Sequence, residues 1–580
     1  MWGDVDQVTY RRFRDEARVF WHSHLAAGGA DQQVVADVSH PDPRMLLRVL
    51  TVANAVRRLH PARLVLLSPG DGPPPRADAL AALAEAYAAD EIVDVGARTA
   101  CQVTAFAARA AGGGALPAEV GTLTPYVDAG YRRHVRAPLS ARLRATAGYQ
   151  LAALRARART AVYDDVFAAR RLVALVTADV TDDVAGVAAR AARRAHAPVV
   201  AVVPRGGLRA YCLFPGADPA AGFAEALAPR VAAFFASRVW ARRAELTAAA
   251  ERTAWRARRG LDRPAGRPAD ALELANGVQR RQVRAHAAAR WGLDADRPTV
   301  VVAHRPVTES PCGAAADPAE WFAATAAHAR TRTEVNWLFL DHPAQEDRTG
   351  TVAALAAAHA DAPHLRFVPG AAVGRNAMVG LADLAVVPHG RLAPALAGWG
   401  VPVLAAAVAP WSGCGFVLPD TGGAPYPERL HAAVADLAAG RLAADGARVA
   451  RARLWRWLAD AGADIVSGLV PPWDLWPAEH LLRAVTVHLR QVEPDGEPVF
   501  AAVERAFTHR LPLLTRADLP AGPAPGAAPH CREPAASPGP AGAGGGPVPA
   551  AHGPARDGPT RAGGGATAGG GLRGRAAVGE

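Results

Sequence analysis

Short apolar runs that alternate with longer helical segments constrain the fold of this chain more than any other feature. From about residue 34 the order is VVADVS, PRMLLRVLTVANAVRRLH and RLVLLSPGDG, followed later by RLVALVTADV, DDVAGVAARAARRAH and PVVAVVPRGG. Such alternation is typical of βαβ units, whose strands form a parallel sheet with helices on both faces. We therefore predict a first Rossmann-like domain over residues 31–240, preceded by a helical segment over residues 1–30.

The same alternation starts again near residue 298. The apolar runs are PTVVVAHRP, NWLFLDHP, HLRFVPG, LAVVPHG and VPVLAAA. They predict a second parallel sheet of at least five strands over residues 293–470, so the fold class is α/β with two Rossmann-like lobes. Residues 241–292 have helical spacing and few strand formers, which predicts helices that join the lobes, and residues 471–516 predict C-terminal helices. Residues 517–580 contain too few large apolar side chains to offset the entropy of ordering, so we expect a disordered tail.

Charge and cysteine content exclude several classes of protein. All 65 basic residues are arginine and the formal net charge is +11, but the arginines are spread along predicted helices rather than gathered with aromatic residues. We therefore expect no nucleic-acid partner. The five cysteines are far apart, and the first residues carry charges of both signs without an apolar core, which predicts a reducing, cytoplasmic location. Prolines and glycines interrupt the most hydrophobic window, 392–414, so we predict no transmembrane helix.

Polar residues follow three strands of the predicted second sheet, at the edge where open parallel sheets bind ligands. Gly390 permits a tight turn into a helix that starts near Leu392, whose N-terminal amides favour a phosphate, and Arg391 can pair with a diphosphate. For one His-Gly pair alone, an ordinary turn is an equally good explanation. Three polar strand ends together favour a ligand site. They are His304 with Arg305, Asp341 with His342, and His389 with Gly390 and Arg391.

A family resemblance rests on a spaced set of motifs: VVVAHRPVTESP, DPAEWFAATAAHARTRTEVNWLFLDHP, LADLAVVPHG, GWGVPVLAAAVAPWSGCGFVLP and YPERL. This set resembles the donor lobe of bacterial GT-B glycosyltransferases of the capsule and surface polysaccharide type, over roughly residues 295–432. In the first lobe, VYDDVFAARRLVALV and VVPRGGLRAY are more weakly similar to the acceptor side of that family. The resemblance implies two Rossmann-like lobes in the GT-B arrangement. It also implies transfer of a sugar from a nucleotide sugar to a glycan or lipid-linked acceptor, in the cytoplasm or peripherally at the inner face of the plasma membrane.

The resemblance further implies a donor site and no cofactor or metal centre. His342 matches the histidine of the family's Lys-x-His-Pro segment, and His389 with Gly390 matches its donor-phosphate turn. Ser412 and Gly413 match the small-residue loop after the next strand, and we expect Arg305 to assist. The chain departs from the family at four positions: Leu340 replaces the lysine, Arg391 a threonine, Ala393 a glycine and Ala395 a glutamate that would hold the donor ribose.

These departures leave two functions open. In an active glycosyltransferase, Arg391 would take over charge neutralisation from the missing lysine. Alternatively, the chain is a catalytically degenerate GT-B protein that acts as a binding or scaffolding subunit. A sugar epimerase of the same fold would need acidic residues in the cleft, and the sequence identifies none there.

A base for the acceptor hydroxyl would come from the first lobe. His40 and Asp42 follow a strand in DVSHPDPR and are the candidates, although loop residues before a helix cap explain them equally well. The pairs in YDDV (163–166) and TDDV (181–184) predict helix-start carboxylates rather than a metal site, because adjacent helical residues point to different faces. Trp411 could stack on a base or a sugar, but core packing is the more frequent fate of a tryptophan.

Overall fold

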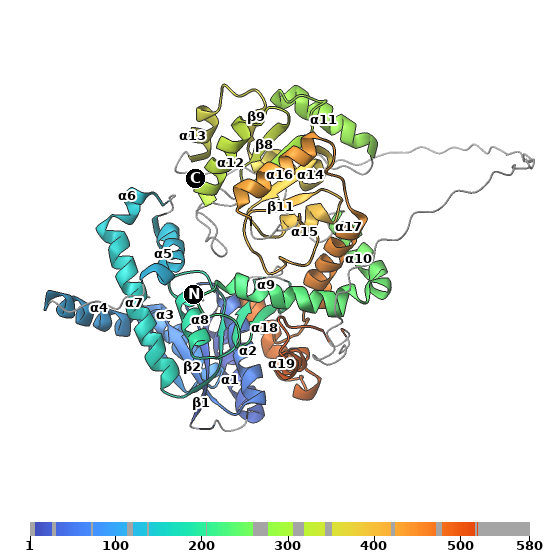
Figure 1. Ribbon diagram of the computed structural model, residues 1–580. Coiled ribbons are helices and arrows are strands. Elements are labelled where there is room, and N and C mark those ends of the chain that lie inside the picture. Colours follow the sequence, from blue (N-terminus) through green and yellow to red (C-terminus); the bar gives the residue numbers. More distant parts are fainter. Residues whose placement is uncertain are drawn as a thin grey trace, which may run out of the picture. The chain divides into compact units, whose positions relative to one another are not determined.

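The computed structural model describes residues 6–25, 29, 31–70, 74–112, 120–135, 139–204, 206–258, 277–304, 318–342, 351–418, 424–470, 478–516 and 519. Its first lobe is built on a six-stranded sheet in the order β3-β2-β1-β4-β5-β6. Figure 1 shows β1 and β2 of this sheet among the helices of the lobe. Neighbouring strands are parallel except for β5 and β6, which are antiparallel. The strands are β1 (Gln32–Asp37), β2 (Arg63–Ser68), β3 (Glu91–Asp94), β4 (Arg171–Thr177), β5 (Val199–Val202) and β6 (Ala210–Leu213).

Alternate side chains of β1 belong to two different cores, one on each face of this sheet. Val34 and Ala36 lie in one cluster of buried side chains, whereas Val35 lies in another. A strand that is covered on both faces must be apolar at successive positions, which explains the continuous run VVA in the sequence.

The long helix α2 (Pro43–Leu59) lies at the centre of the first lobe, with 13 of its 17 residues buried. It begins where the sequence supplies both a capping carboxylate, Asp42, and a proline in the first turn, where the missing N–H has no cost. Helix α8 (Ala185–Arg194) contacts β4 and β5, whereas α1 (Gln7–His24) and α3 (Pro74–Ala86) pack on each other.

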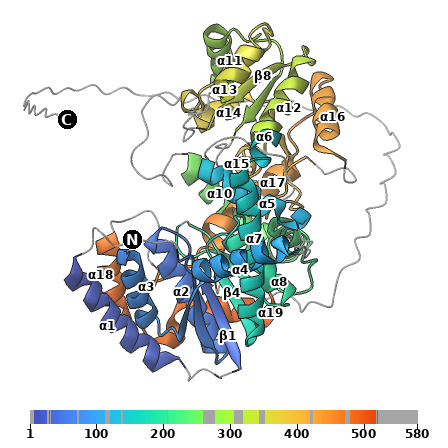
Figure 2. The same cartoon turned by 90° about the vertical axis from the view of Figure 1, so that its left-hand side faces the viewer.

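A helical crossover connects β3 at one edge of the first sheet to β4 beyond β1. The strand order requires this long connection, because the chain must pass β2 and β1 before it adds β4. The crossover consists of α4 (Val95–Ala111), α5 (Val120–Val135), α6 (Ala141–Arg144) and α7 (Ala147–Ala168). Helices α7 and α8 both contact β4 and each other, so they lie on the same face of the sheet (Figure 2).

The second lobe has a five-stranded sheet in the order β11-β10-β7-β8-β9, and every neighbouring pair is parallel. Its strands are β7 (Thr299–Ala303), β8 (Asn336–Leu340), β9 (Leu365–Val368), β10 (Leu384–Val387) and β11 (Val403–Ala405). Its helices are α11 (Gly277–Trp291), α12 (Pro318–Arg330), α13 (Thr351–Ala358), the 3₁₀ turn η2 (Gly370–Ala372), α14 (Arg375–Leu381), α15 (Leu392–Ala397) and α16 (Tyr426–Ala438). The prediction of two parallel α/β lobes is confirmed.

Two helical connections join the lobes. The first runs through α9 (Phe223–Phe234), the π-helical turn η1 (Phe235–Trp240) and α10 (Arg243–Arg258). The second runs through α17 (Gly446–Trp457) and the π-helical turn η3 (Leu458–Gly462), and the rings of Phe235 and Trp455 meet across them at 6.2 Å. Trp455 of α17 thus packs against the first connection and holds the two connections together.

The last helices return to the first lobe. They are α18 (Ala478–Leu489), which packs on α1, the 3₁₀ turn η4 (Pro494–Gly496) and α19 (Pro498–His509), which packs on α2. The ring of Phe500 in α19 lies 5.9 Å from that of Trp21 in α1. Among the helices that the structure describes, none is both long and apolar enough to cross a membrane. Apart from Leu519, the predicted tail at 517–580 lies outside the described residues.

Candidate functional site

The carboxyl ends of β7 and β10 form the first candidate edge. The chain builds β7, β8 and β9 outward in one direction and β10 and β11 in the other, so the strand order reverses between β7 and β10. Open α/β sheets bind ligands at such a switch point. His304 follows β7, and Pro388, His389 and Gly390 follow β10.

The two histidines at this switch point have different surroundings. The ring of His304 is 4% exposed and lies edge-on against Phe322, with 4.2 Å between ring centroids. Its Nε2 is 3.3 Å from the carbonyl oxygen of Pro318 in α12. His304 therefore packs beneath α12. His389 is also buried, at 8% exposed, so the exposed polar side chain of the turn after β10 is that of Arg391.

That turn is open at Gly390. Its φ of +98° is in the left-handed region that favours glycine, and a Cβ built there would meet no atom within 4 Å. The carbonyl of Gly390 accepts a hydrogen bond of 3.1 Å from Nε1 of Trp411, which is itself 5% exposed and packs on Phe416. Trp411 thus supports the turn from the core, in agreement with the packing interpretation, and does not present its ring for stacking.

Helix α15 begins at Leu392, as predicted, with Arg391 as its exposed N-cap residue. The helix has only six residues, with Pro394 inside it, so its dipole is small. A charge contribution to an anion at this edge would therefore come mainly from the Arg391 guanidinium. Ala393 and Ala395, which stand where the family that the sequence resembles has Gly and Glu, are 0% and 3% exposed and pack into the core.

The carboxyl end of β8 contributes Asp341 and His342. Leu340, at the position of the family's lysine, is 1% exposed and lies in the core. The Asp341 carboxylate accepts a 2.7 Å hydrogen bond from the backbone N–H of His342. Because β7 lies between β8 and β10, these residues are two strand spacings, about 10 Å, from the Gly390 turn. Arg305 lies outside the described residues.

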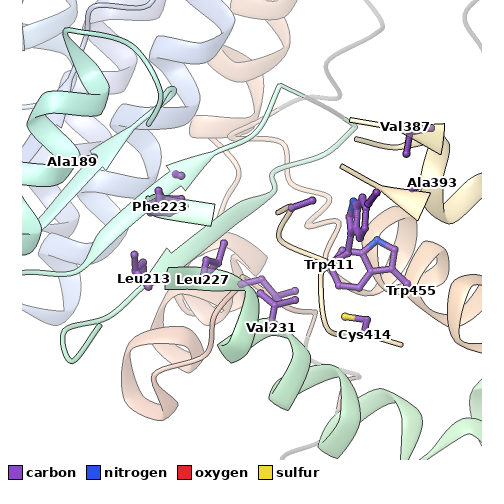
Figure 3. Close-up of a cluster of buried hydrophobic side chains, with 14 of the residues drawn as sticks. Ala189, Leu213, Phe223, Leu227, Val231, Val387, Ala393, Trp411, Cys414 and Trp455 are labelled. Atoms are coloured by element: carbon purple, nitrogen blue, oxygen red, sulfur yellow. The ribbon is translucent and has the colours of Figure 1, made fainter. Parts of the chain in front are cut away.

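The small-residue loop after β11 packs against α9. Ser412 Oγ accepts a hydrogen bond from Ala409 N at 2.9 Å, which closes a local turn. At Gly413 the φ is +85°, and a Cβ would lie 3.1 Å from the Cβ of Ala232 in α9. Figure 3 shows Leu227 and Val231 of the same helix in one buried cluster with Trp411 and Cys414. Glycine at 413 therefore allows this close approach of two segments.

A second candidate edge lies at the carboxyl ends of β1 and β4, where the strand order of the first sheet reverses. Asp37, the last residue of β1, is 3% exposed and accepts a 2.8 Å hydrogen bond from Thr177 Oγ1 at the end of β4. Burial raises the pKa of Asp37, while its hydrogen bonds with Thr177 and Ser39 oppose that shift. Asp37 was not predicted as a site residue, although the carboxylate at the end of the apolar run VVAD was an available signal.

The predicted catalytic residues His40 and Asp42 both follow β1, but they differ in role. Asp42 caps α2: its carboxylate accepts from Arg44 N at 2.9 Å and from the Arg44 guanidinium at 2.6 Å. His40 Nδ1 accepts the backbone N–H of Asp42 at 3.1 Å, so a neutral ring has its proton on Nε2 and donates there. Burial lowers the pKa of His40, against the opposing effect of Asp42 and Asp179, which favours this neutral form.

Arg133 of α5 joins two carboxylates of the loop after β4. Its guanidinium donates to Asp179 at 3.1 Å and to Asp182 at 2.9 Å. Asp182 also accepts from the backbone N–H groups of Val184 and Ala185. Burial, followed by the nearby Asp179 carboxylate, raises the pKa of Asp182 to about 6, while Arg133 opposes the shift.

The interpretation of TDDV as helix-start carboxylates is therefore confirmed for Asp182, which precedes α8. For YDDV it is wrong, because these residues lie in the last turns of α7, where Asp164 pairs with Arg194 of α8. Helical periodicity did not identify the start of α7 sixteen residues earlier, at Ala147. In the described part of the chain, no group of three or more His, Cys, Asp or Glu side chains is arranged to hold a metal ion.

Comparisons with known proteins give structural likenesses only. No protein-family model matches the chain, and no curated protein matches it. Among solved structures, the glycotransferase of kitacinnamycin is similar over 80% of this chain and 99% of its own, with 15% identity and a TM-score of 0.23. MurG of Acinetobacter baumannii covers 82% of this chain and 99% of its own, with 13% identity and a TM-score of 0.21.

A third similar structure is assigned as a UDP-N-acetylglucosamine 2-epimerase from Listeria monocytogenes. It has 11% identity and a TM-score of 0.24, over 75% of this chain and 96% of its own. TM-scores this low support no argument about activity. The function therefore has to be argued from the residues at the two sheet edges.

Proposed function

We propose that this protein is a glycosyltransferase that moves a sugar from a nucleotide-activated donor to a surface polysaccharide or lipid-linked glycan acceptor. The main support is the turn at Gly390, where a switch point, an open glycine backbone and an exposed arginine coincide. The proposal includes a cytoplasmic protein, free or bound peripherally to the inner membrane face, with no cofactor. The nucleotide sugar is its substrate.

The donor diphosphate is proposed to bind at the Gly390 turn. Because a Cβ at residue 390 would enter open space, a ligand can approach the backbone there more closely than at any residue with a side chain. Arg391 next to it provides a guanidinium, which suits the paired oxygens of a diphosphate. His389, His342 and Arg305 complete the proposed donor site, and the Asp341 carboxylate at the end of β8 is proposed to accept hydrogen bonds from ribose hydroxyls.

The acceptor is proposed to bind at the edge formed by β1 and β4. A hydroxyl nucleophile needs a proton acceptor within hydrogen-bond reach. Because Nδ1 of His40 is engaged by Asp42 N, this ring supports a role as a hydrogen-bond donor to the acceptor better than a role as the base. Asp182 is the better candidate base, because a carboxylate has about four lone-pair sites and its three hydrogen bonds, from Arg133 and from two backbone N–H groups, leave one for a hydroxyl. Its pKa of about 6 also suits proton transfer near neutral pH.

A binding or scaffolding subunit without catalysis is the second candidate function. It is favoured by Leu340 and Ala395, which are buried where the family that the sequence resembles has a lysine and a glutamate. An enzyme with these replacements would have lost a phosphate ligand and a ribose ligand. In that case the Gly390 turn would no longer bind a donor, and the protein would show neither nucleotide binding nor sugar transfer.

Calorimetric titration of the full-length protein with nucleoside diphosphates and nucleotide sugars tests the proposal. We expect one nucleotide to bind at micromolar strength and Arg391→Ala to weaken it by roughly tenfold or more, since a charge-assisted hydrogen bond contributes over 1.4 kcal/mol. The control is Arg441→Ala, whose exposed side chain pairs with Asp436 in the same lobe. No binding across the panel would favour the scaffolding function, and equal effects of the two variants would contradict the phosphate assignment.

A further inference from the structure

A cavity of about 520 Å³ lies at the amino-terminal edge of the first sheet. Residues that line it come from the starts of β4 and β5, from the ends of α2, α7 and α8, and from α19. Along β4, Thr177 at the acceptor edge lies about 20 Å from Arg171 and about 13 Å from Val173, the nearest lining residue of this strand, at roughly 3.3 Å per residue. A ligand in this cavity could not touch groups at that edge, so the cavity is a site separate from the proposed function.

Cationic and aromatic side chains dominate the wall of this cavity. The polar groups are the guanidinium groups of Arg170 and Arg171 and the imidazoles of His60 and His196. None of the described residues that line it is an aspartate or a glutamate. The ring of Phe507, from α19, lies 5.9 Å from the ring of His60 and provides an apolar surface beside the cations. This combination favours a ligand with a negative charge and a ring.

The two arginines retain capacity for such a ligand. Arg170 is 3.6 Å from the Glu91 carboxylate, and Arg171 donates to the Gln32 side chain at 3.2 Å. A guanidinium has five N–H donors, so one such contact engages only part of it. Burial and the neighbouring Arg171 charge lower the pKa of His60, which agrees with a positive potential in the cavity.

The basic residues around the cavity are not needed to neutralise the helix dipoles at this edge. The negative ends of α2 and α8 lie at this edge, and basic residues in a last turn would complement them. Both helices already have such residues within their own last turns, namely Arg57, Arg58, Arg193 and Arg194. Arg170 and Arg171 lie beyond the helix ends and add further positive charge around the cavity, and His196 adds an imidazole.

His196 occupies a position that normally favours glycine. It follows α8 with a φ of +54°, and the N–H of the next residue, Ala197, returns to the carbonyl of Ala192. This is the left-handed end of a helix, where a side chain is strained and glycine is common. A histidine here costs stability and adds an imidazole to the cavity wall. Strained residues of this kind occur preferentially at binding sites.

We propose that this cavity binds a small phosphate monoester attached to a ring, with the phosphate held by Arg171, His60 and His196 and the ring against Phe507. A dianionic phosphate matches the cations better than a single carboxylate does. A cavity of about 520 Å³ also accommodates more than an inorganic phosphate ion, since ligand pockets typically start near 300 Å³.

Calorimetric titration of the full-length protein with phenyl phosphate, and separately with inorganic phosphate, tests this site. We expect phenyl phosphate to bind more tightly than inorganic phosphate, and Arg171→Ala to weaken it by about tenfold. Arg98→Ala, which removes an exposed arginine from α4 in the same lobe, should leave the affinity unchanged. Absence of phenyl phosphate binding, or an equal loss in both variants, overturns the proposal.

His196→Gly separates a binding role from a structural one. Glycine relieves the left-handed strain, so we expect the variant to unfold at a higher temperature than the natural protein, and yet to bind phenyl phosphate about tenfold more weakly. If thermal stability rises and the affinity does not change, His196 is only a helix terminus and the assignment is wrong. Nucleoside diphosphate binding at the second lobe should be the same in both proteins, which distinguishes failure of this site from failure of the donor site.

Discussion

Replacement of the glycines on either side of α15 tests whether the turn after β10 binds a ligand. Gly390 and Gly400 have φ values of +98° and +89°, so alanine is strained at both positions. Both positions also have room for a methyl group: a Cβ at 390 meets nothing within 4 Å, and a Cβ at 400 lies 3.8 Å from its nearest neighbour, Ala444. Gly390→Ala and Gly400→Ala should therefore have nearly the same steric cost, and they differ mainly in where the methyl group is placed.

Each alanine variant should lose about 1–2 kcal/mol of stability, because only the left-handed backbone opposes the side chain. Nucleotide binding should separate the two variants. At residue 390 the methyl group would occupy the open space that we assign to the donor diphosphate, and we expect the affinity to fall by roughly tenfold or more. Gly400 follows the other end of α15, so Gly400→Ala should bind the nucleotide as the natural protein does.

Two measurements on the same samples test whether a nucleotide binds at the Gly390 turn. Urea unfolding gives the loss of stability, and calorimetric titration with the best nucleotide of the panel gives the affinity. A similar loss of stability in both variants with a selective loss of affinity in Gly390→Ala supports the site. If Gly390→Ala binds as tightly as Gly400→Ala, no ligand approaches the Gly390 backbone and the phosphate assignment is wrong.

Three further predictions concern the first lobe. Asp42→Ala removes a helix cap and should lower the free energy of unfolding by about 1 kcal/mol, measured in urea, with turnover retained; loss of turnover in a folded variant would restore Asp42 as the base. Arg48→Met should lose about 2–4 kcal/mol, because Arg48 is 1% exposed and donates to the carbonyls of Gly207 at 2.7 Å and Gly206 at 2.8 Å; an unchanged unfolding midpoint would contradict this. Asp182 has a folded-state pKa of about 6, above its unfolded value of about 3.9, so the folded state binds more protons between these pH values and the stability from this group falls as the pH rises. Urea unfolding at several pH values should show that fall in the natural protein and a flatter profile in Asp182→Asn.

Most strands could be predicted because a parallel sheet covered on both faces requires uninterrupted apolar runs. All five strands of the second sheet correspond to runs recognised in the sequence, and the start of α15 at Leu392 was also predicted. The two strands of the first sheet that were missed, β3 and β6, have only four residues each, and β3 has exposed or half-buried positions at Glu91, Ile92 and Asp94. Length alone is not the reason, because β5, β9, β10 and β11 are as short or shorter and were predicted. With a single buried position, β3 gives no apolar run, and β6 is an antiparallel edge strand that is half-buried at Tyr211.

The helical crossover α4 to α7 was not predicted either. Its longest helix, α7, is rich in alanine, and its apolar residues show almost no helical periodicity although eight of its side chains are buried. The existence of the crossover follows instead from topology, because β4 is placed beyond β1 and the chain must cross two strands to reach it.

In the second lobe the candidate edge was predicted from the polar residues that follow the strands. In the first lobe only His40 and Asp42 were predicted, and Asp37, Asp182 and Arg133 were not. After β10 the polar residues come as His389, Gly390 and Arg391 in one run, so the end of the strand itself marks the site. At the first switch point the groups are brought together only by folding: Asp37 ends β1, Asp182 follows β4, and Arg133 comes from α5.

The same physical rule nevertheless explains both edges. Where the strand order of an open sheet reverses, the loops from two neighbouring strands diverge and leave their terminal residues uncovered by a common helix. In the second lobe, Gly390 and Arg391 lie at this switch point, and an open backbone next to a guanidinium suits an anion. In the first lobe, Asp37, Asp182 and His40 lie at the corresponding switch point, and carboxylates with an imidazole suit hydroxyl groups and proton transfer. A nucleotide donor and a hydroxyl acceptor are the pair of substrates that needs both kinds of edge, and this complementarity is the reason to prefer a transferase over a protein with a single binding site.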